Sequence, residues 1–599
     1  PRSSRGPAAW HPGREAPWFI MRPAARAPRR RSRLSSNVRP RNHASLPSVD
    51  RATIPTRNCL KVVMPLVSED AIRLALKNIS SYGDTDIFPF PIENHLLHDR
   101  PADVLAVLLE VDKAFDTYVS RIPVLTSKEL SVVGYGGFRQ GTQIDPLWNA
   151  YLLALVLSVA PEIESRRVAT NTVFSYRYAP DPATGALFDK AIGWQQFQAA
   201  ASAAAAVNPF VLRCDISDFY PRVYHHRLEN ALGGAVAKPE ITKRIMTLLR
   251  EISEGPSYGL PVGGPAARIL SELLLNRVDR LLLLENIRFC RFVDDYAIFA
   301  KSREEAQSSL ITLTKLLLTN EGLSLQKAKT RVMTAAEYLA TSDFATAPDG
   351  ESPEDHHART FRLLRIHYDP YSPTAAADYA ALAAELGRFD IIGMLGRELA
   401  KSRIDEGLTR RLVAAIRHLP PAAQNDAVRS MVASLDLLYP IFPAVMQLCR
   451  SLLPSLEASV KEALFSAVRE LVTQNSYITQ VPANLAFALR LLASDRSEET
   501  EQMLATVYKR SSSMMIRRDV ILIMASRGSE HWVSNCRMTF ATLTAWEKRA
   551  LLIASFTLRD EGKHWRDAIR RDQNEFDQLI LTWTGDSKST KGSGWTVPI

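Results

Sequence analysis

The stretch that decides the fold is Arg291-Phe292-Val293-Asp294-Asp295-Tyr296-Ala297-Ile298-Phe299, where two adjacent carboxylates lie between two apolar runs. This pattern predicts a β-hairpin with both acids at its turn. Like charges on a tight turn repel each other, so a cationic partner is expected, and a pair of divalent metal ions would serve. Asp-Asp also occurs at turns for conformational reasons alone, so both interpretations stay open for this stretch by itself.

A third carboxylate follows an upstream strand pattern, Phe210-Val211-Leu212-Arg213-Cys214-Asp215-Ile216. Alternating residues share a face of a strand, so Asp215 lies near the strand end, and Pro221 suits the first turn of a following helix. A strand-end carboxylate together with a pair at a hairpin turn is the ligand set of a two-metal phosphoryl-transfer site. One Mg²⁺ would activate an attacking 3′-hydroxyl, and both ions would neutralise a triphosphate.

Between these segments lies a Gly/Pro turn, Tyr258-Gly259-Leu260-Pro261-Val262-Gly263-Gly264-Pro265, which leads into a long apolar helix ending near Leu284. Glycines at such a turn allow the backbone to approach a ligand closely.

These motifs, in this order, resemble motifs A, B and C of a reverse transcriptase palm: Asp-x-x-x-Phe-Tyr from Asp215, Leu-Pro-x-Gly-Gly-Pro from Leu260, and Phe-Val-Asp-Asp from Phe292. Residues 323–330 resemble the next motif, whose lysine lies near the incoming triphosphate. Residues 173–178 resemble the fingers strand whose arginine grips that triphosphate. The resemblance covers residues 64–345.

The resemblance implies a site and its ligands. Two Mg²⁺ ions, with Mn²⁺ as an alternative, are the implied cofactors, and dNTPs with an RNA or DNA strand are the implied partners. The implied catalytic and metal-binding residues are Asp215, Asp294 and Asp295, and the implied nucleotide-binding residues are Arg177, Asp218, Phe219, Tyr220, Val262, Gly263 and Lys329.

Residues 83–91 and 138–146 resemble segments of the bacterial abortive-infection and defence-associated reverse transcriptases, the "unknown group" relatives. Many members append a helical-repeat domain. This implies a cytoplasmic bacterial enzyme of antiphage defence, with a noncoding RNA as a further partner and a homo-oligomeric state. Val262 stands where many templated reverse transcriptases have Gln, which helps position the nucleotide against the template. The defence relatives often share this change, which leaves protein-primed or template-independent synthesis open.

Two other functions compete with this one. An RNA-dependent RNA polymerase shares the palm, but it usually has a carboxylate or amide where Tyr220 stands, five residues after Asp215. A bulky ring there would clash with a ribose 2′-hydroxyl. A catalytically inactive palm acting as a nucleic-acid-binding scaffold is disfavoured because clustered carboxylates are electrostatically costly without metal.

The charge of the chain is concentrated at one end. Of 74 Lys and Arg and 64 Asp and Glu, residues 1–63 hold 14 and 2, so residues 64–599 carry 60 basic against 62 acidic side chains. The globular body is therefore not broadly basic, and a nucleic-acid groove must be a local patch. No apolar run of about 18 residues exists, so no membrane span is expected. Five scattered cysteines form no zinc pattern and fit a reducing cytosol.

The chain divides by composition into six parts. We expect a disordered basic extension over residues 1–63, with translation normally starting near Met64, because Arg and Pro dominate and no apolar periodicity exists. A nucleic-acid arm and a transit peptide are the alternatives for that extension. N-terminal helices and fingers follow over 64–207, the palm over 208–345 and a hydrophilic linker over 346–357. A HEAT-like helical-repeat domain is expected over 358–584 and a flexible tail over 585–599.

For two polar segments of the chain, the sequence allows two roles each. Polar residues at 139–149 around a helix start suit either an RNA or template contact or a capped helix with a solvated face. Arg517, Arg518 and the basic residues of 559–566 suit either nucleic-acid contact or a solvated helix face.

Overall fold

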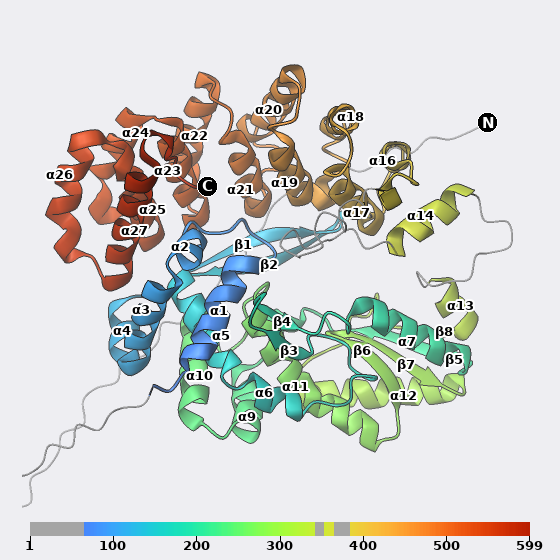
Figure 1. The fold of residues 1–599 in the computed structure, drawn as a ribbon. Helices are drawn as coiled ribbons and strands as arrows, with labels where there is room; N and C mark the ends of the chain where they lie inside the picture. Colours follow the sequence, from blue (N-terminus) through green and yellow to red (C-terminus); the bar gives the residue numbers. More distant parts are fainter. Residues whose placement is uncertain (1–64, 342–352, 364–381, 383) are drawn as a thin grey trace, which may run out of the picture. The chain divides into compact units, whose positions relative to one another are not determined.

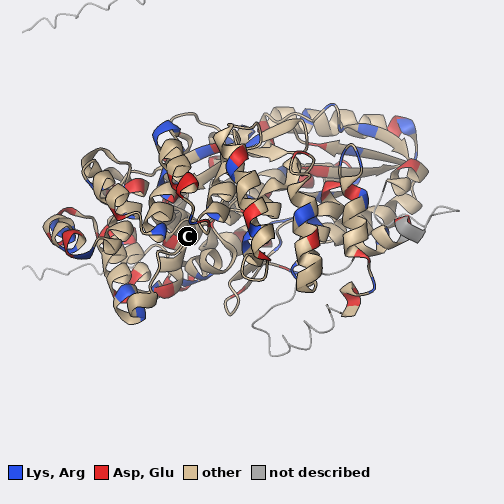
Figure 2. Ribbon diagram, turned by 90° about the horizontal axis from the view of Figure 1, so that it is seen from above, with Lys and Arg blue, Asp and Glu red and all other residues tan. Residues whose placement is uncertain are grey.

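The computed structural model describes residues 65–341, 353–363, 382 and 384–599, which belong to one compact unit, Val63–Ile599 (Figure 1). The extension predicted over residues 1–63 and the start expected near Met64 lie outside the described residues. No helix of the described part is long and apolar enough to cross a membrane. Lys and Arg are interspersed with Asp and Glu along the described ribbon, as expected for a nearly neutral body (Figure 2).

The N-terminal part is helical, with two β-hairpins, as the sequence predicts for a helical and fingers region. Ser68 accepts a hydrogen bond from the Ala71 amide and so caps the first helix, and Asp145 caps α5 in the same way. Every residue of α5 is buried, which makes it the central helix of this part. The elements are α1 (Glu69–Tyr82), α2 (Glu93–Asp99), α3 (Pro101–Lys113), α4 (Phe115–Arg121), β1 (Thr126–Val133), β2 (Gly137–Ile144), α5 (Pro146–Leu157), α6 (Ala160–Ser165), β3 (Tyr178–Asp181), β4 (Ala186–Phe188) and α7 (Trp194–Ala206).

The palm contains a four-stranded antiparallel sheet in the order β6-β7-β5-β8. Its strands are β5 (Phe210–Asp215), β6 (Arg288–Phe292), β7 (Asp295–Ala300) and β8 (Arg331–Thr334). The predicted strand at 210–216 and the predicted hairpin at 291–299 are confirmed. The helices are α8 (Phe219–Arg222), α9 (His225–Ala235), α10 (Pro239–Ser253), α11 (Pro265–Leu284), α12 (Arg303–Leu316) and α13 (Ala335–Ala340).

The C-terminal region is helical throughout its described part. Alternate helices contact one another in two rows, α16-α18-α20-α22 and α17-α19-α21-α23-α25-α27. This is how short amphipathic helices bury their apolar faces by stacking, and the HEAT-like assignment stays a prediction. The helices are α14 (Pro353–Leu363), α16 (Ile391–Leu399), α17 (Glu406–Ile416), α18 (Pro421–Val432), α19 (Phe442–Leu452), α20 (Ala458–Thr473), α21 (Pro482–Leu492), α22 (Glu498–Arg510), α23 (Met514–Arg527), α24 (Glu530–Arg537), α25 (Ala545–Ala554), α26 (Arg559–Ile569) and α27 (Glu575–Lys591).

Two predicted boundaries need correction. The linker expected over 346–357 lies partly outside the described residues, and its last five residues begin helix α14 instead. Pro353 followed by two acids is typical of a first helical turn, a signal that the hydrophilic composition concealed. The tail expected over 585–599 is also wrong, because α27 continues to Lys591 and Val597 is buried. Packing decides the structure of this segment, where composition alone suggested a flexible chain.

The helical region docks on the two segments that carry the family resemblance at 83–91 and 138–146. Asp145 Oδ2 accepts hydrogen bonds from Trp546 Nε1 at 3.0 Å and from Arg549 Nη1 at 2.5 Å. Gln143 is fully buried and accepts from Arg518 Nη1 at 3.3 Å. For residues 139–149 the sequence allowed either a nucleic-acid contact or a capped helix. Asp145 caps α5, so the capped helix is the correct interpretation for this residue. Arg139 is exposed. Arg518 is buried in this contact, so the solvated-face interpretation does not describe it.

Candidate active site

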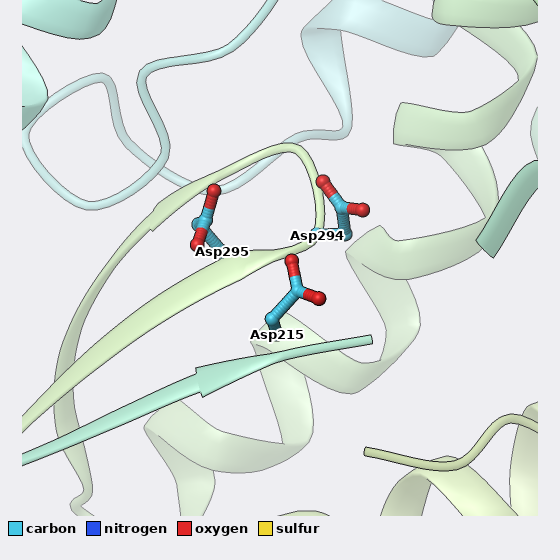
Figure 3. A group of neighbouring side chains, drawn as sticks. All are labelled: Asp215, Asp294 and Asp295. Carbon is cyan, nitrogen blue, oxygen red and sulfur yellow. The ribbon is translucent and has the colours of Figure 1, made fainter. Parts of the chain in front are cut away.

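Three carboxylates meet where β5 ends and the β6–β7 hairpin turns (Figure 3). Asp215 is the register partner of Asp295, and the Ile216 amide donates to the Asp294 carbonyl at 3.1 Å, so the strand pairing itself holds the acids together. One oxygen from each carboxylate lies within 4.8 Å of the others. We refer to Asp215, Asp294 and Asp295 as the carboxylate triad.

The three carboxylates of the triad repel one another. Burial, reinforced by the nearby charges of Asp215 and Asp295, raises the pKa of Asp294 to about 7. Burial and the charge of Asp215 also raise the pKa of Asp295. Lys329 Nζ lies 3.1 Å from Asp215 Oδ2, but this lysine side chain is 64% exposed. Three hard oxygen ligands that repel one another fit divalent cations such as Mg²⁺, which would favour the ionised carboxylates.

The hairpin turn is conformationally strained. Val293 has a φ of +55°, a left-handed conformation that is unfavourable for a β-branched residue. Arg291 Nη1 donates to the Val293 carbonyl at 2.7 Å and so holds the turn in place. The backbone of Arg291 is fixed as well, because its amide donates to Thr172 O and its carbonyl accepts from the Phe174 amide.

A buried ionic network holds Arg291 in turn. The guanidinium is fully buried, with Nη2 3.0 Å from Glu272 and 2.6 Å from Asp279, both on α11. Glu272 also accepts from Ser175 Oγ and from Arg167 Nη2, at 2.5 and 2.6 Å. The network therefore connects the fingers segment, the helix after the glycine turn and the β6–β7 hairpin to one another. Sequence reasoning missed it, although two acids seven residues apart on an apolar helix were a usable signal.

The residues of the first motif lie beside the triad on a tight turn. Asp218 is exposed and has a left-handed φ of +48°, Phe219 is buried, and Tyr220 is half-buried. The Tyr220 hydroxyl lies 3.5 Å from Ser271 Oγ on α11. Burial raises the pKa of Tyr220, so its hydroxyl remains protonated.

The glycine turn packs against the opening loop of the fingers. Gly263 has a φ of +115°, and a Cβ there would lie 2.2 Å from Thr85 Oγ1, so no other residue fits without a rearrangement. Val262 is half-buried and packs against the apolar core.

Arg177, a predicted nucleotide-binding residue, is buried and paired within the fingers. Its guanidinium is buried, with Nη2 2.5 Å from Glu164 and Nη1 donating to Val168 O at 2.9 Å. The expectation that this arginine faces the triphosphate stays a prediction, and it requires the guanidinium to leave Glu164. The residue before it, Tyr176, has a left-handed φ of +46°, and no sequence pattern predicted that turn.

One prediction concerns the pH dependence of the metal-free protein. Because the folded pKa of Asp294 is raised, its contribution to stability is present below about pH 4 and is lost as pH rises through about 7. In EDTA, we expect the wild type to lose on the order of 2 to 4 kcal/mol more than Asp294→Asn over that window. Melting temperatures of both proteins from pH 4 to 8.5 measure this difference. Parallel curves would show that Asp294 is ionised without strain.

The comparisons with known proteins define the class of the domain that carries the triad. Residues 172–364 match the family model described as "Reverse transcriptase (RNA-dependent DNA polymerase)". The chain thus contains a reverse transcriptase domain, and its enzymatic class is that of an RNA-directed DNA polymerase, a nucleotidyltransferase. No curated protein matches the chain.

The similar solved structures include telomerases of two yeasts. Apo telomerase from Candida tropicalis has a TM-score of 0.28 and 9% identity, covering 64% of this chain and 74% of that one. Telomerase from Candida albicans in complex with a TWJ fragment of telomeric RNA has a TM-score of 0.26 and 9% identity, covering 67% and 68%.

Proposed function

We propose that this chain extends DNA by two-metal phosphoryl transfer, with Mg²⁺, or Mn²⁺ in its place, held by Asp215, Asp294 and Asp295. The observation that carries the proposal is the meeting of a strand-end carboxylate and two turn carboxylates within 4.8 Å. Bound metal ions would activate the 3′-hydroxyl and neutralise the triphosphate. The protein positions the three carboxylates through strand register and through the hydrogen bond from Arg291 to the hairpin turn.

The nucleotide pocket is proposed to form between the triad and the glycine turn. Lys329 lies beside Asp215 with an exposed ammonium group, so it can meet a triphosphate. Gly263 and Val262 would pass close to the base and sugar, with Asp218 and Phe219 shaping the opposite side. Arg177 would join only if it left Glu164, with which it is paired.

Tyr220 is proposed to select deoxynucleotides, and this gives a second prediction. Tyr220 follows Asp215 by five residues and is not fully buried, so its ring can stack under the sugar and exclude a 2′-hydroxyl. Tyr220→Val should keep dNTP use within roughly tenfold, about 1.4 kcal/mol of barrier, while ribonucleotide incorporation rises at least about tenfold. Tyr220→Phe, which keeps the ring, is the matched control and should discriminate like the wild type. Wild-type incorporation of NTPs as efficiently as dNTPs would contradict the gate and favour an RNA polymerase.

The wider role is proposed from the resemblance to the abortive-infection reverse transcriptases. On that basis the enzyme acts in antiphage defence in the bacterial cytoplasm, as a homo-oligomer and with a noncoding RNA partner. Val262 in place of Gln supports protein-primed or template-independent synthesis. Sequencing the DNA that co-purifies with the protein, and testing its 5′ end for covalently attached protein, tests this directly. Product that copies a supplied RNA from a supplied primer would overturn the protein-primed, untemplated route.

A further inference from the structure

An arginine-lined pocket of about 410 Å³ lies in the palm between α9, α11 and the turn Leu317–Glu321. Arg227 of α9 and Arg277 and Arg280 of α11 line it. We call this set the arginine pocket. Arg166 lines it as well, but its Nη1 donates to Gly234 O at 2.5 Å and is occupied. Arg277 lies 13 positions beyond Gly264, roughly 20 Å along the helix from the glycine turn, so the pocket is separate from the triad.

The positive charge of the pocket is only partly compensated within the described residues. There, neither Arg227, Arg277 nor Arg280 forms an ion pair. The acid that lines the pocket is Glu321, which is 4% exposed and, within the same residues, accepts no hydrogen bond. Burial raises the pKa of Glu321 to about 7, although Arg277 and Arg227 act in the opposite direction. Three arginines and one buried acid line the pocket, which leaves an excess of positive charge that an anion would neutralise.

The pocket also has apolar lining residues. Leu281 and Leu284 line it, and Leu284 is 77% exposed. An exposed leucine in a pocket lined by arginines suits a ligand that carries both a flat apolar part and an anionic part. Guanidinium groups match phosphate oxygens in a forked geometry, which favours phosphate as the anion.

We propose that the arginine pocket binds a phosphate group of a nucleotide or of a nucleic-acid strand, with a base or sugar resting on Leu281 and Leu284. The site does not depend on metal, unlike the triad, and it does not depend on the polymerase chemistry proposed above. Glu321 opposes the anion and so keeps the affinity moderate.

The test uses the full chain in EDTA, where the triad has no metal with which to hold phosphate. Pyrophosphate is titrated calorimetrically into the wild type, the double variant Arg277→Gln/Arg280→Gln, the variant Glu321→Gln and the control Arg288→Gln. Arg288 is exposed and does not line the pocket. We expect the double variant to bind at least fivefold more weakly and Glu321→Gln to bind several-fold more tightly, with the control unchanged. Melting temperatures show whether each variant is folded.

Titrations with other ligands show which kind of molecule carries the phosphate. Loss of affinity for a single-stranded RNA decamer in the double variant, with pyrophosphate as a competitor, identifies a strand. Loss for dATP alone identifies a free nucleotide. An oligoglutamate peptide that binds through Arg277 while pyrophosphate does not would overturn the proposal, as would unchanged pyrophosphate affinity in the folded double variant. Incorporation of dNTPs by the double variant, measured separately, distinguishes failure of this site from failure of the polymerase assignment.

Discussion

Asp294→Asn should reduce dNTP incorporation at least a thousandfold, about 4 kcal/mol of barrier, while the protein stays folded. The substitution keeps the shape of the side chain and removes one of three charges that would hold the metal ions. The same change relieves repulsion within the triad, so in EDTA at pH 8 the variant should melt at a higher temperature than the wild type. A primer-extension assay with Mg²⁺ measures the first effect and a thermal melt the second.

Asp116→Asn is the matched control, because Asp116 is exposed on α4 and far from the site in sequence. It should leave both activity and melting unchanged. Undiminished incorporation by Asp294→Asn would refute the assignment of the triad. If Asp294→Asn loses activity but also unfolds, Asp295→Asn replaces it, because this variant removes a different carboxylate of the same triad.

The second large effect is expected at Arg549, which is 1% exposed. Its guanidinium lies 2.5 Å from Asp145, 2.8 Å from Asp577 and 3.6 Å from Glu93. Arg549→Met leaves three buried carboxylates without their cation, and breaking a buried pair from one side costs about 3 to 5 kcal/mol. Both Glu93 oxygens already lack hydrogen bonds, and burial raises the pKa of Glu93. The helical region should therefore loosen from the fingers.

Thermal melting and limited proteolysis measure this loosening. Arg559→Met is the control, since Arg559 is 87% exposed and its side chain should contribute within about 0.5 kcal/mol. Equal melting temperatures for the two variants would show that the buried cluster is dispensable for docking. Replacing Asp145 by Asn together with Arg549→Met should recover part of the loss, because one of the stranded charges is then removed.

Local sequence patterns were sufficient to predict the triad. They were insufficient to predict the buried ion pairs that hold the hairpin turn in place. Asp215, Asp294 and Asp295 could be located because strand alternation and a hairpin turn are short-range signals. Arg291 lay in the quoted stretch, but its partners Glu272 and Asp279 come from a helix that only the fold brings near. The family motif located Arg177 along the chain. It could not predict that the side chain is buried and paired with Glu164, because a motif does not give side-chain direction.

The same limit applies to the helical region. Apolar periodicity predicted its helices, for example α20, where Val460, Leu464 and Val468 are buried as their spacing indicates. It could not predict that Arg518 and Arg549 are buried against the fingers, since a charged residue on a helix is usually solvated. A tertiary partner decides that, and it lies about 400 residues away in the chain.

The loop that begins at Gly83 contacts β2 on one side and the glycine turn on the other. Asp84 accepts from Gln143, which accepts from Arg518 of the helical region. Its neighbour Thr85 fills the space that Gly263 leaves open, and the Asp84 carbonyl lies 3.4 Å from where a Cβ on Gly264 would be. The helical region therefore contacts this loop through Gln143, and the loop in turn contacts the glycine turn. A displacement of α23 would therefore pass through this loop to the backbone of the glycine turn, which we propose lies against the nucleotide.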